Sequence, residues 1–264
     1  MSEQHPSPQE RKARGRALRK ATPRESHADY APTSDRTDPV ALIEGQNESR
    51  LQFLLPVRRA RMVASPFAFF RGAARIMASD LAPTPVSGLT TQICGDAHLA
   101  NFGAYASPER QLVFDVNDFD ETLPGPWEWD VKRLAASFHI AARHNELDEK
   151  AARSVVRAAV RAYQAGMRKF AGMRLTDLWY SYVAAKDVVE TEKDRKRRRV
   201  AGRALEKARG KDSIQALRKL AEVVDGEYRI RRDPPLLIPV RDLADDAERK
   251  KLVDAVHETF EAYK

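Results

Sequence analysis

The stretch CGDAHLANFGAYASPERQLVFDVNDFDETLPGPWEWD, residues 94–130, decides how this chain is interpreted. It holds eight Asp and Glu residues and a single basic residue, Arg110. Carboxylates that cluster in this way repel one another unless a cation or hydrogen-bond donors offset their charge. The composition of this stretch therefore indicates a functional site instead of an ordinary surface.

Two short strings inside this stretch carry the candidate chemistry, GDAHLAN (95–101) and FDVNDFDE (114–121). Asp96 follows a predicted strand, Asn101 comes five residues later, and Asp118 follows a second predicted strand. A magnesium–nucleotide site needs hard oxygen ligands that stay ionised at neutral pH. It also needs one carboxylate that orients or deprotonates the attacking hydroxyl. The order and spacing of these residues favour such a site.

Around these strings the chain alternates short strands with longer helices, which predicts an α+β fold that is predominantly helical. The Ser65-Pro66 pair predicts a helix start, and apolar residues recur at helical spacing after Pro126. The expected elements are a helix over 65–82, a strand over 89–95, a hairpin over 101–116, helices over 127–144 and 147–173, helical structure over 175–224, an extended connector over 227–240 and a helix over 241–263.

The ends and the composition of the chain suggest its organisation. Residues 1–38 are rich in Pro, Ser and Arg and poor in large apolar residues, so we expect a disordered basic arm followed by one domain over 39–264. No apolar run approaches the roughly 20 residues that span a bilayer. The single cysteine, Cys94, suits a reducing compartment. A cytoplasmic protein without a membrane segment is expected.

The segment resembles the catalytic half of aminoglycoside phosphotransferases and choline kinases, which are protein-kinase-like enzymes. These enzymes carry His-Gly-Asp-x-x-x-x-Asn, then Ile-Asp-Phe, then a further Asp at a helix start. The corresponding residues here are Asp96, Asn101, Asp118 and Asp130, the last twelve positions beyond Asp118. The resemblance implies Asp96 as catalytic base, Asn101 and Asp118 as Mg²⁺ ligands, ATP as phosphoryl donor and Asp130 as a structural brace.

Two neighbouring residues complete the predicted site. Asp120 is ranked above Asp115 as a second carboxylate at the metal. Asp115 is an odd number of positions from Asp118, so in an extended segment these two side chains point to opposite faces. His98 has two interpretations: it is a metal ligand beside Asp96, or it supports the loop by packing or hydrogen bonding. The second is favoured.

A longer part of the chain is similar to the bacterial domain-of-unknown-function 2252 family (DUF2252). The similarity runs through RMVASPFAFFRGAARIMASDLA (61–82), CGDAHLANFG (94–103) and NDFDETLPGPWEWDVKRLAASF (117–138), and covers roughly residues 40 to 264. These motifs are long and distinctive. The family name does not by itself supply a substrate.

The sequence departs from the kinase pattern in several places. Cys94 replaces the usual His, and Asp120 stands where protein kinases have the Gly of Asp-Phe-Gly. No Gly-rich phosphate loop with a following strand Lys precedes Asp96. The resemblance implies that longer relatives carry these parts on the C-terminal side. We therefore expect a catalytic-lobe domain whose nucleotide lobe is missing or permuted, and a chain that is inactive alone.

Three functions remain open at this point. The first is Mg²⁺-dependent phosphoryl transfer from a nucleotide to a small hydroxyl acceptor of unknown identity. The second is a non-catalytic anion or nucleic-acid binder that uses the basic stretch 193–211, which holds ten Lys and Arg against two acids. Nucleic acid is disfavoured because no aromatic residues interleave these charges. The third is a metal-dependent phosphoesterase. The oligomeric state is left open.

Overall fold

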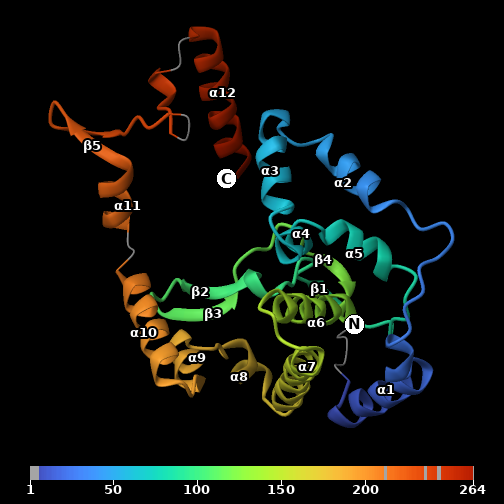
Figure 1. The fold of residues 1–264 in the computed structure, drawn as a ribbon. Helices are drawn as coiled ribbons and strands as arrows, with labels where there is room; N and C mark the ends of the chain where they lie inside the picture. Colours follow the sequence, from blue (N-terminus) through green and yellow to red (C-terminus); the bar gives the residue numbers. More distant parts are fainter. Residues whose placement is uncertain (1–5, 211–212, 235–236, 243–244, 264) are drawn as a thin grey trace, which may run out of the picture. The chain divides into compact units, whose positions relative to one another are not determined.

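The computed structural model describes residues 6–210, 213–234, 237–242 and 245–263. It is a mixed α+β protein in which helices predominate, and the described residues form three two-stranded antiparallel sheets (Figure 1). This confirms the predicted fold class. The chain divides into two compact units, Met1–Val188 and Val189–Lys264. The sequence predicted one domain over 39–264, and the division lies inside it.

The described residues form helices, strands and short 3₁₀ turns, with the following bounds. The helices are α1 (Pro8–Ala21), α2 (Pro39–Asn47), α3 (Leu55–Met62), α4 (Pro66–Arg71), α5 (Ala74–Leu81), α6 (Trp127–His144), α7 (Glu149–Ala171), α8 (Leu175–Trp179), α9 (Ala185–Thr191), α10 (Arg195–Arg209), α11 (Ser213–Leu220) and α12 (Asp246–Tyr263). The strands are β1 (Thr90–Ile93), β2 (Phe102–Ala106), β3 (Leu112–Val116), β4 (Leu123–Pro126), β5 (Ala221–Val224) and β6 (Glu227–Ile230). Short 3₁₀ turns are η1 (Arg24–His27), η2 (Gln52–Leu54), η3 (Leu99–Asn101) and η4 (Val240–Asp242).

Helix α6 is the central element of the first unit. It packs against α7, α4, α5, β1 and β4. The predicted apolar positions of this helix include Trp127, Val131, Leu134, Phe138 and Ala142. Of these, Ala142 is buried and the other four are half-buried. Its other buried side chains are polar, namely Glu128, Arg133 and Ser137. Buried polar groups need partners, so the inner face of α6 is built for specific contacts.

The first unit contains two strand pairs, of which β1–β4 contacts α6. The hairpin β2–β3 pairs Phe102 with Val116 and Ala106 with Leu112, which confirms the predicted hairpin. Strand β1 pairs with β4, a partner that the sequence did not predict because Leu-Pro-Gly-Pro is typical of a loop. Gly125 makes this pairing feasible, since a Cβ atom there would lie 2.8 Å from Ile93 Cδ1.

The helix predicted over 65–82 is interrupted. Its start is as predicted, because the Ser65 hydroxyl accepts a hydrogen bond from the Ala68 amide at 3.0 Å. The helix ends at Arg71, with Gly72 as its C-cap, and a second helix, α5, begins at Ala74. At Gly72 a Cβ atom would lie 2.9 Å from Met62 Sδ. The close approach of α3 therefore coincides with the break between α4 and α5.

Within the segment predicted as a disordered arm, residues 6–38 are described and include α1 and η1. Helix α1 begins with a capping box, in which Ser7 and Glu10 satisfy each other's amide groups. Arg36 forms two hydrogen bonds to the Asp80 carboxylate of α5, at 2.6 and 2.9 Å. The prediction of a disordered arm rests on low apolar content, and apolar content carries no information about helix caps or ion pairs.

The second unit differs from its predicted helical and extended segments. Helix α10 continues through Gly202, since a glycine is tolerated inside a helix at a modest energetic cost. Strands β5 and β6 form a hairpin where helix and connector were predicted. Its turn residues Asp225 and Gly226 have φ of 55° and 81°, as an Asp-Gly hairpin turn requires. No helix within the described ranges is long and apolar enough to cross a membrane.

Candidate active site

The loop after β1 is held by the first turn of α6. One Asp130 carboxylate oxygen accepts a hydrogen bond from the Cys94 amide at 2.7 Å, and the other accepts one from the Gly95 amide at 3.0 Å. Gly95 has φ of +78°, and a Cβ atom there would lie 2.1 Å from the Glu121 carbonyl oxygen. Burial raises the pKa of Asp130 above its ordinary value, while the two amide hydrogen bonds lower it. Helix α6 thus fixes the backbone just before Asp96.

The Asp96 carboxylate is paired with an arginine that the sequence analysis did not single out. Arg133 of α6 contacts Asp96 Oδ1 through Nε at 2.5 Å and also through Nη2. The Arg133 side chain is 2% exposed and that of Asp96 18% exposed. The guanidinium also donates to the Phe70 carbonyl at 3.0 Å and lies over the Phe70 ring at 4.5 Å. Arg133 therefore neutralises and orients the predicted catalytic base.

Asn101 joins the two predicted strings. Its buried side-chain amide donates to the backbone carbonyls of Asp96 and Asp118, each at 3.1 Å. The Asn117 amide in turn donates to the Asn101 carbonyl at 2.9 Å. The loop of Asp96 and the segment of Asp118, distant in sequence, are therefore brought together by one side chain. With its nitrogen engaged, the amide oxygen of Asn101 is the atom left for another ligand.

The two remaining predicted metal ligands are exposed to solvent. Asp118 Oδ1 accepts a long hydrogen bond of 3.4 Å from the Asp120 amide, and both side chains are exposed. Their carboxylates and the Asn101 amide oxygen are hard donors of the kind that Mg²⁺ prefers. This donor chemistry fits the predicted metal. In the described part of the chain, no three His, Cys, Asp or Glu side chains gather as a ready metal cluster.

His98 lies beside Asp96 in the buried part of the loop. Its Nε2 is 3.6 Å from Asp96 Oδ2, and the ring is largely excluded from solvent. Its Nδ1 is buried without a hydrogen-bond partner among the described residues. Burial lowers the pKa of His98, and Asp96 opposes this while Arg133 adds to it. This position places His98 with the predicted base and not beside the exposed carboxylates.

We expect the stability of the chain to fall on acidification through His98. The ordinary pKa of 6.5 is lowered in the folded state, so below this pH the unfolded chain binds a proton that the folded chain resists. More protons on the unfolded state mean that the free energy of unfolding decreases as pH falls. Urea unfolding between about pH 7.5 and 5 should show a shallower decline in His98→Gln than in the native chain.

The control for this pH series is His144→Gln, at the exposed end of α6. It should leave the slope of stability against pH nearly unchanged. An identical slope in the native chain and in His98→Gln would contradict the expectation.

Cys94 is unsuited to nucleophilic chemistry. Burial raises its pKa to about 11, and the neighbouring Asp130 charge acts in the same direction. Its thiol lies 3.7 Å from the Asp118 carbonyl and 3.6 Å from the Asn101 amide nitrogen. A thiol that stays protonated is a weak nucleophile. Cys94 is therefore a packing residue of the loop.

These features define a mixed α+β protein in which one helix, α6, braces the acidic loop after β1. A family model described as "Uncharacterized protein conserved in bacteria (DUF2252)" matches residues 50–264. The chain belongs to this family, which confirms the similarity predicted from its motifs. No curated protein and no solved structure matches the chain. The resemblance to aminoglycoside phosphotransferases and choline kinases gains no support from these comparisons.

Proposed function

We propose that this chain carries the catalytic-loop and metal-binding parts of a kinase-like phosphotransferase. The reaction is transfer of a nucleotide γ-phosphoryl group to the hydroxyl of a small acceptor, with ATP and Mg²⁺ as cofactors. As part of this proposal, the domain that carries the site is the counterpart of a kinase-like catalytic lobe. The proposal includes a cytoplasmic location.

The observation that carries the proposal is the brace from Asp130 to the loop of Asp96. Phosphoryl transfer depends almost wholly on positioning and on neutralisation of charge, so a loop held at two successive amides suits it. Both contacts are short, at 2.7 and 3.0 Å. Asn101 supports the same assignment, because its amide holds the Asp96 and Asp118 backbones together.

Each residue has a stated role in this mechanism. Asp96 orients the acceptor hydroxyl, and Arg133 holds the Asp96 carboxylate in one position. The Asn101 amide oxygen and the carboxylates of Asp118 and Asp120 would hold Mg²⁺. The ion, when bound, supplies positive charge that offsets the charge developing on the transferring phosphoryl group. His98 packs against the base and excludes water from one side of it.

The first test is Mg²⁺ binding by titration calorimetry of the 264-residue chain. Asp118→Asn removes one ionised ligand, so we expect a several-fold weaker affinity. Asp115→Asn is the matched control, because it removes the same charge from an exposed residue of β3, three positions before Asp118. The Asp115 Oδ1 atom accepts a hydrogen bond from the Val116 amide at 2.8 Å. Equal affinities in the native chain and both variants would remove the metal assignment.

The second test is phosphoryl transfer from ATP in the presence of Mg²⁺. We expect little turnover by this chain alone, because no Gly-rich loop with a strand Lys precedes Asp96. Turnover that Asp118→Asn abolishes would support the enzyme and contradict its expected inactivity. Hydrolysis of a simple phosphate ester without ATP would favour the metal-dependent phosphoesterase instead.

A separate observation favours anion binding as a second candidate function. The first turns of α10 present Arg195, Lys196, Arg198 and Arg199 around a hollow of about 520 Å³. A protein that neutralises several phosphates binds them with an affinity that falls steeply with salt. If nucleic-acid binding did not weaken as the salt concentration rises, this candidate would be excluded. Nucleic acid is, however, not the partner that we favour.

A further inference from the structure

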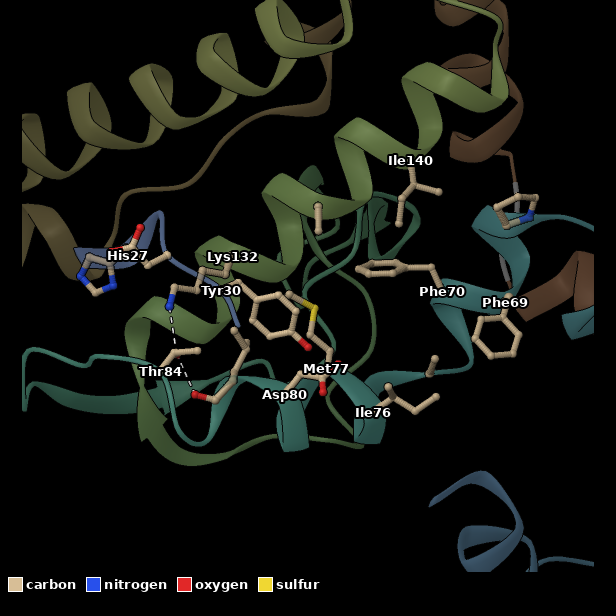
Figure 2. Close-up of a pocket in the computed structure, with 15 residues that line it drawn as sticks. His27, Tyr30, Phe69, Phe70, Ile76, Met77, Asp80, Thr84, Lys132 and Ile140 are labelled. Atoms are coloured by element: carbon tan, nitrogen blue, oxygen red, sulfur yellow. Dashed lines mark hydrogen bonds between the residues drawn. The ribbon is translucent and has the colours of Figure 1, made fainter. Parts of the chain in front are cut away.

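A second concave site lies in the first unit, and none of the predicted site residues lines it. Its volume is about 530 Å³, which falls within the roughly 300–1,000 Å³ of small-molecule sites. Its walls come from the segment around η1, from α4, from α5 and from α6. Four separate segments thus converge on one cavity (Figure 2).

The cavity is polar at one end and apolar at the other. In Figure 2, Lys132, His27 and Thr84 lie on one side, while Phe69, Phe70, Ile76 and Ile140 lie on the opposite side. Ile76 is buried and Phe70 is half-buried. A ligand that fills such a space has an apolar body and a polar group at one end.

Lys132 is the cationic group of the polar end. Its ammonium nitrogen donates to the Thr84 hydroxyl at 3.0 Å, and the Thr84 hydroxyl donates onward to the Leu81 carbonyl at 2.7 Å. Across the described residues, no carboxylate lies within ion-pair distance of Lys132. Burial lowers the pKa of Lys132, and Glu128 opposes this shift. The ammonium therefore lacks a direct counterion and keeps free N–H donors.

The other polar groups of the wall favour an anion over a cation as ligand. Asp80 is already engaged by Arg36 through two hydrogen bonds, at 2.6 and 2.9 Å. Asp29 is exposed, and a solvated charge acts only weakly on a ligand. His27 Nδ1 is buried and has no hydrogen-bond partner among the described residues. The polar end thus offers the Lys132 ammonium as its cationic group, with the His27 ring on the same side of the cavity.

We propose that this cavity binds a small amphipathic organic anion. The anionic group, a carboxylate or sulfonate, lies against Lys132 and within reach of the His27 end. The apolar body lies against Phe70, Ile76 and Ile140. This inference is independent of the proposed phosphotransferase function, since it uses none of the residues assigned to that site.

The test uses a pair of fluorescent probes that differ in charge. Anilinonaphthalene sulfonate is anionic, and N-phenylnaphthylamine has nearly the same apolar body without the sulfonate. We expect the native chain to bind the sulfonate at one site. Lys132→Met keeps most of the apolar stem and removes the charge, so sulfonate binding should weaken roughly ten- to a hundredfold, as for the loss of a charged hydrogen bond. Binding of N-phenylnaphthylamine should change less than about twofold, since it makes no such bond.

The control is Lys150→Met on α7, an exposed lysine that does not line the cavity. It should leave both probes unaffected. Equal loss of both probes in Lys132→Met, or no loss of either, would overturn the proposal, as would absence of sulfonate binding by the native chain. Because the sulfonate also binds partly unfolded proteins, native near-ultraviolet circular dichroism is required of each variant.

A second measurement uses only the native chain and does not depend on a variant that folds. Decanoate and naphthoate each combine an apolar body with a carboxylate, and decanol matches decanoate without the charge. We expect both carboxylates to displace the bound sulfonate probe and decanol to do so far less. If decanoate displaces the probe more strongly, the apolar body of the ligand is aliphatic; if naphthoate does, it is aromatic. Equal displacement by decanol and decanoate would contradict the role of Lys132.

Discussion

Replacing Arg133 with alanine is expected to lower the free energy of unfolding by about 3–5 kcal/mol, because it leaves one member of a buried ion pair without its partner. The Arg133 side chain is 2% exposed. It bonds the Asp96 carboxylate and the Phe70 carbonyl and lies over the Phe70 ring. All of these contacts disappear together in the variant.

Urea unfolding followed by tryptophan fluorescence measures this effect in the first unit, since all three Trp residues lie between positions 127 and 179. The control is Arg153→Ala on α7, whose ion pair with Glu149 is exposed. It should change stability by less than about 1 kcal/mol. Similar small losses in both variants would show that Asp96 does not depend on Arg133.

Replacing Gly95 with alanine is expected to destabilise the first unit by about 2–4 kcal/mol, through a left-handed backbone and a collision. Gly95 has φ of +78°, where an L side chain is strained. A Cβ atom would lie 2.1 Å from the Glu121 carbonyl oxygen, which is backbone and cannot rotate away. The loop would have to move from Asp130, and the brace on Cys94 would be lost with it.

The matched control is Gly166→Ala inside α7, where the nearest atom to a new Cβ is Phe170 Cε2 at 3.9 Å. This change should stabilise the chain by about 0.5–1 kcal/mol, because alanine restricts the unfolded chain and favours helix. The same urea unfolding measurement applies to both variants. A Gly95→Ala chain as stable as the native one would show that the loop does not need this conformation.

The elements predicted correctly are those whose signals are local. Ser65 before Pro66 marks a helix start, and apolar spacing after Pro126 marks α6. The hairpin of β2 and β3 follows from two β-type runs around a turn. The hairpin of β5 and β6 was equally local, and the Asp225-Gly226 pair could have predicted it. It was missed because the flanking residues were assigned to a helix and a connector.

The residues that sequence reasoning missed depend on distant partners. Arg133 and Asp96 are 37 positions apart in the sequence. Arg133 lies on a helix that was predicted from its apolar residues alone. The Arg36 contact with Asp80 spans 44 positions and lies in a segment whose composition predicted disorder. The cavity near Lys132 is formed by segments that share no sequence pattern. Composition and periodicity do not encode such pairings.

By itself, the sequence determined the α+β class and the family, and it placed Asp96, Asn101 and Asp118 at the spacing on which the proposed site rests. These are properties of neighbours along the chain, and local propensity and spacing act over a few residues. Only the tertiary structure decided that Arg133 holds Asp96 and that a separate amphipathic cavity forms beside Lys132. The physical reason is that a buried charge needs a partner. The packing of whole elements decides which group lies close enough to be that partner.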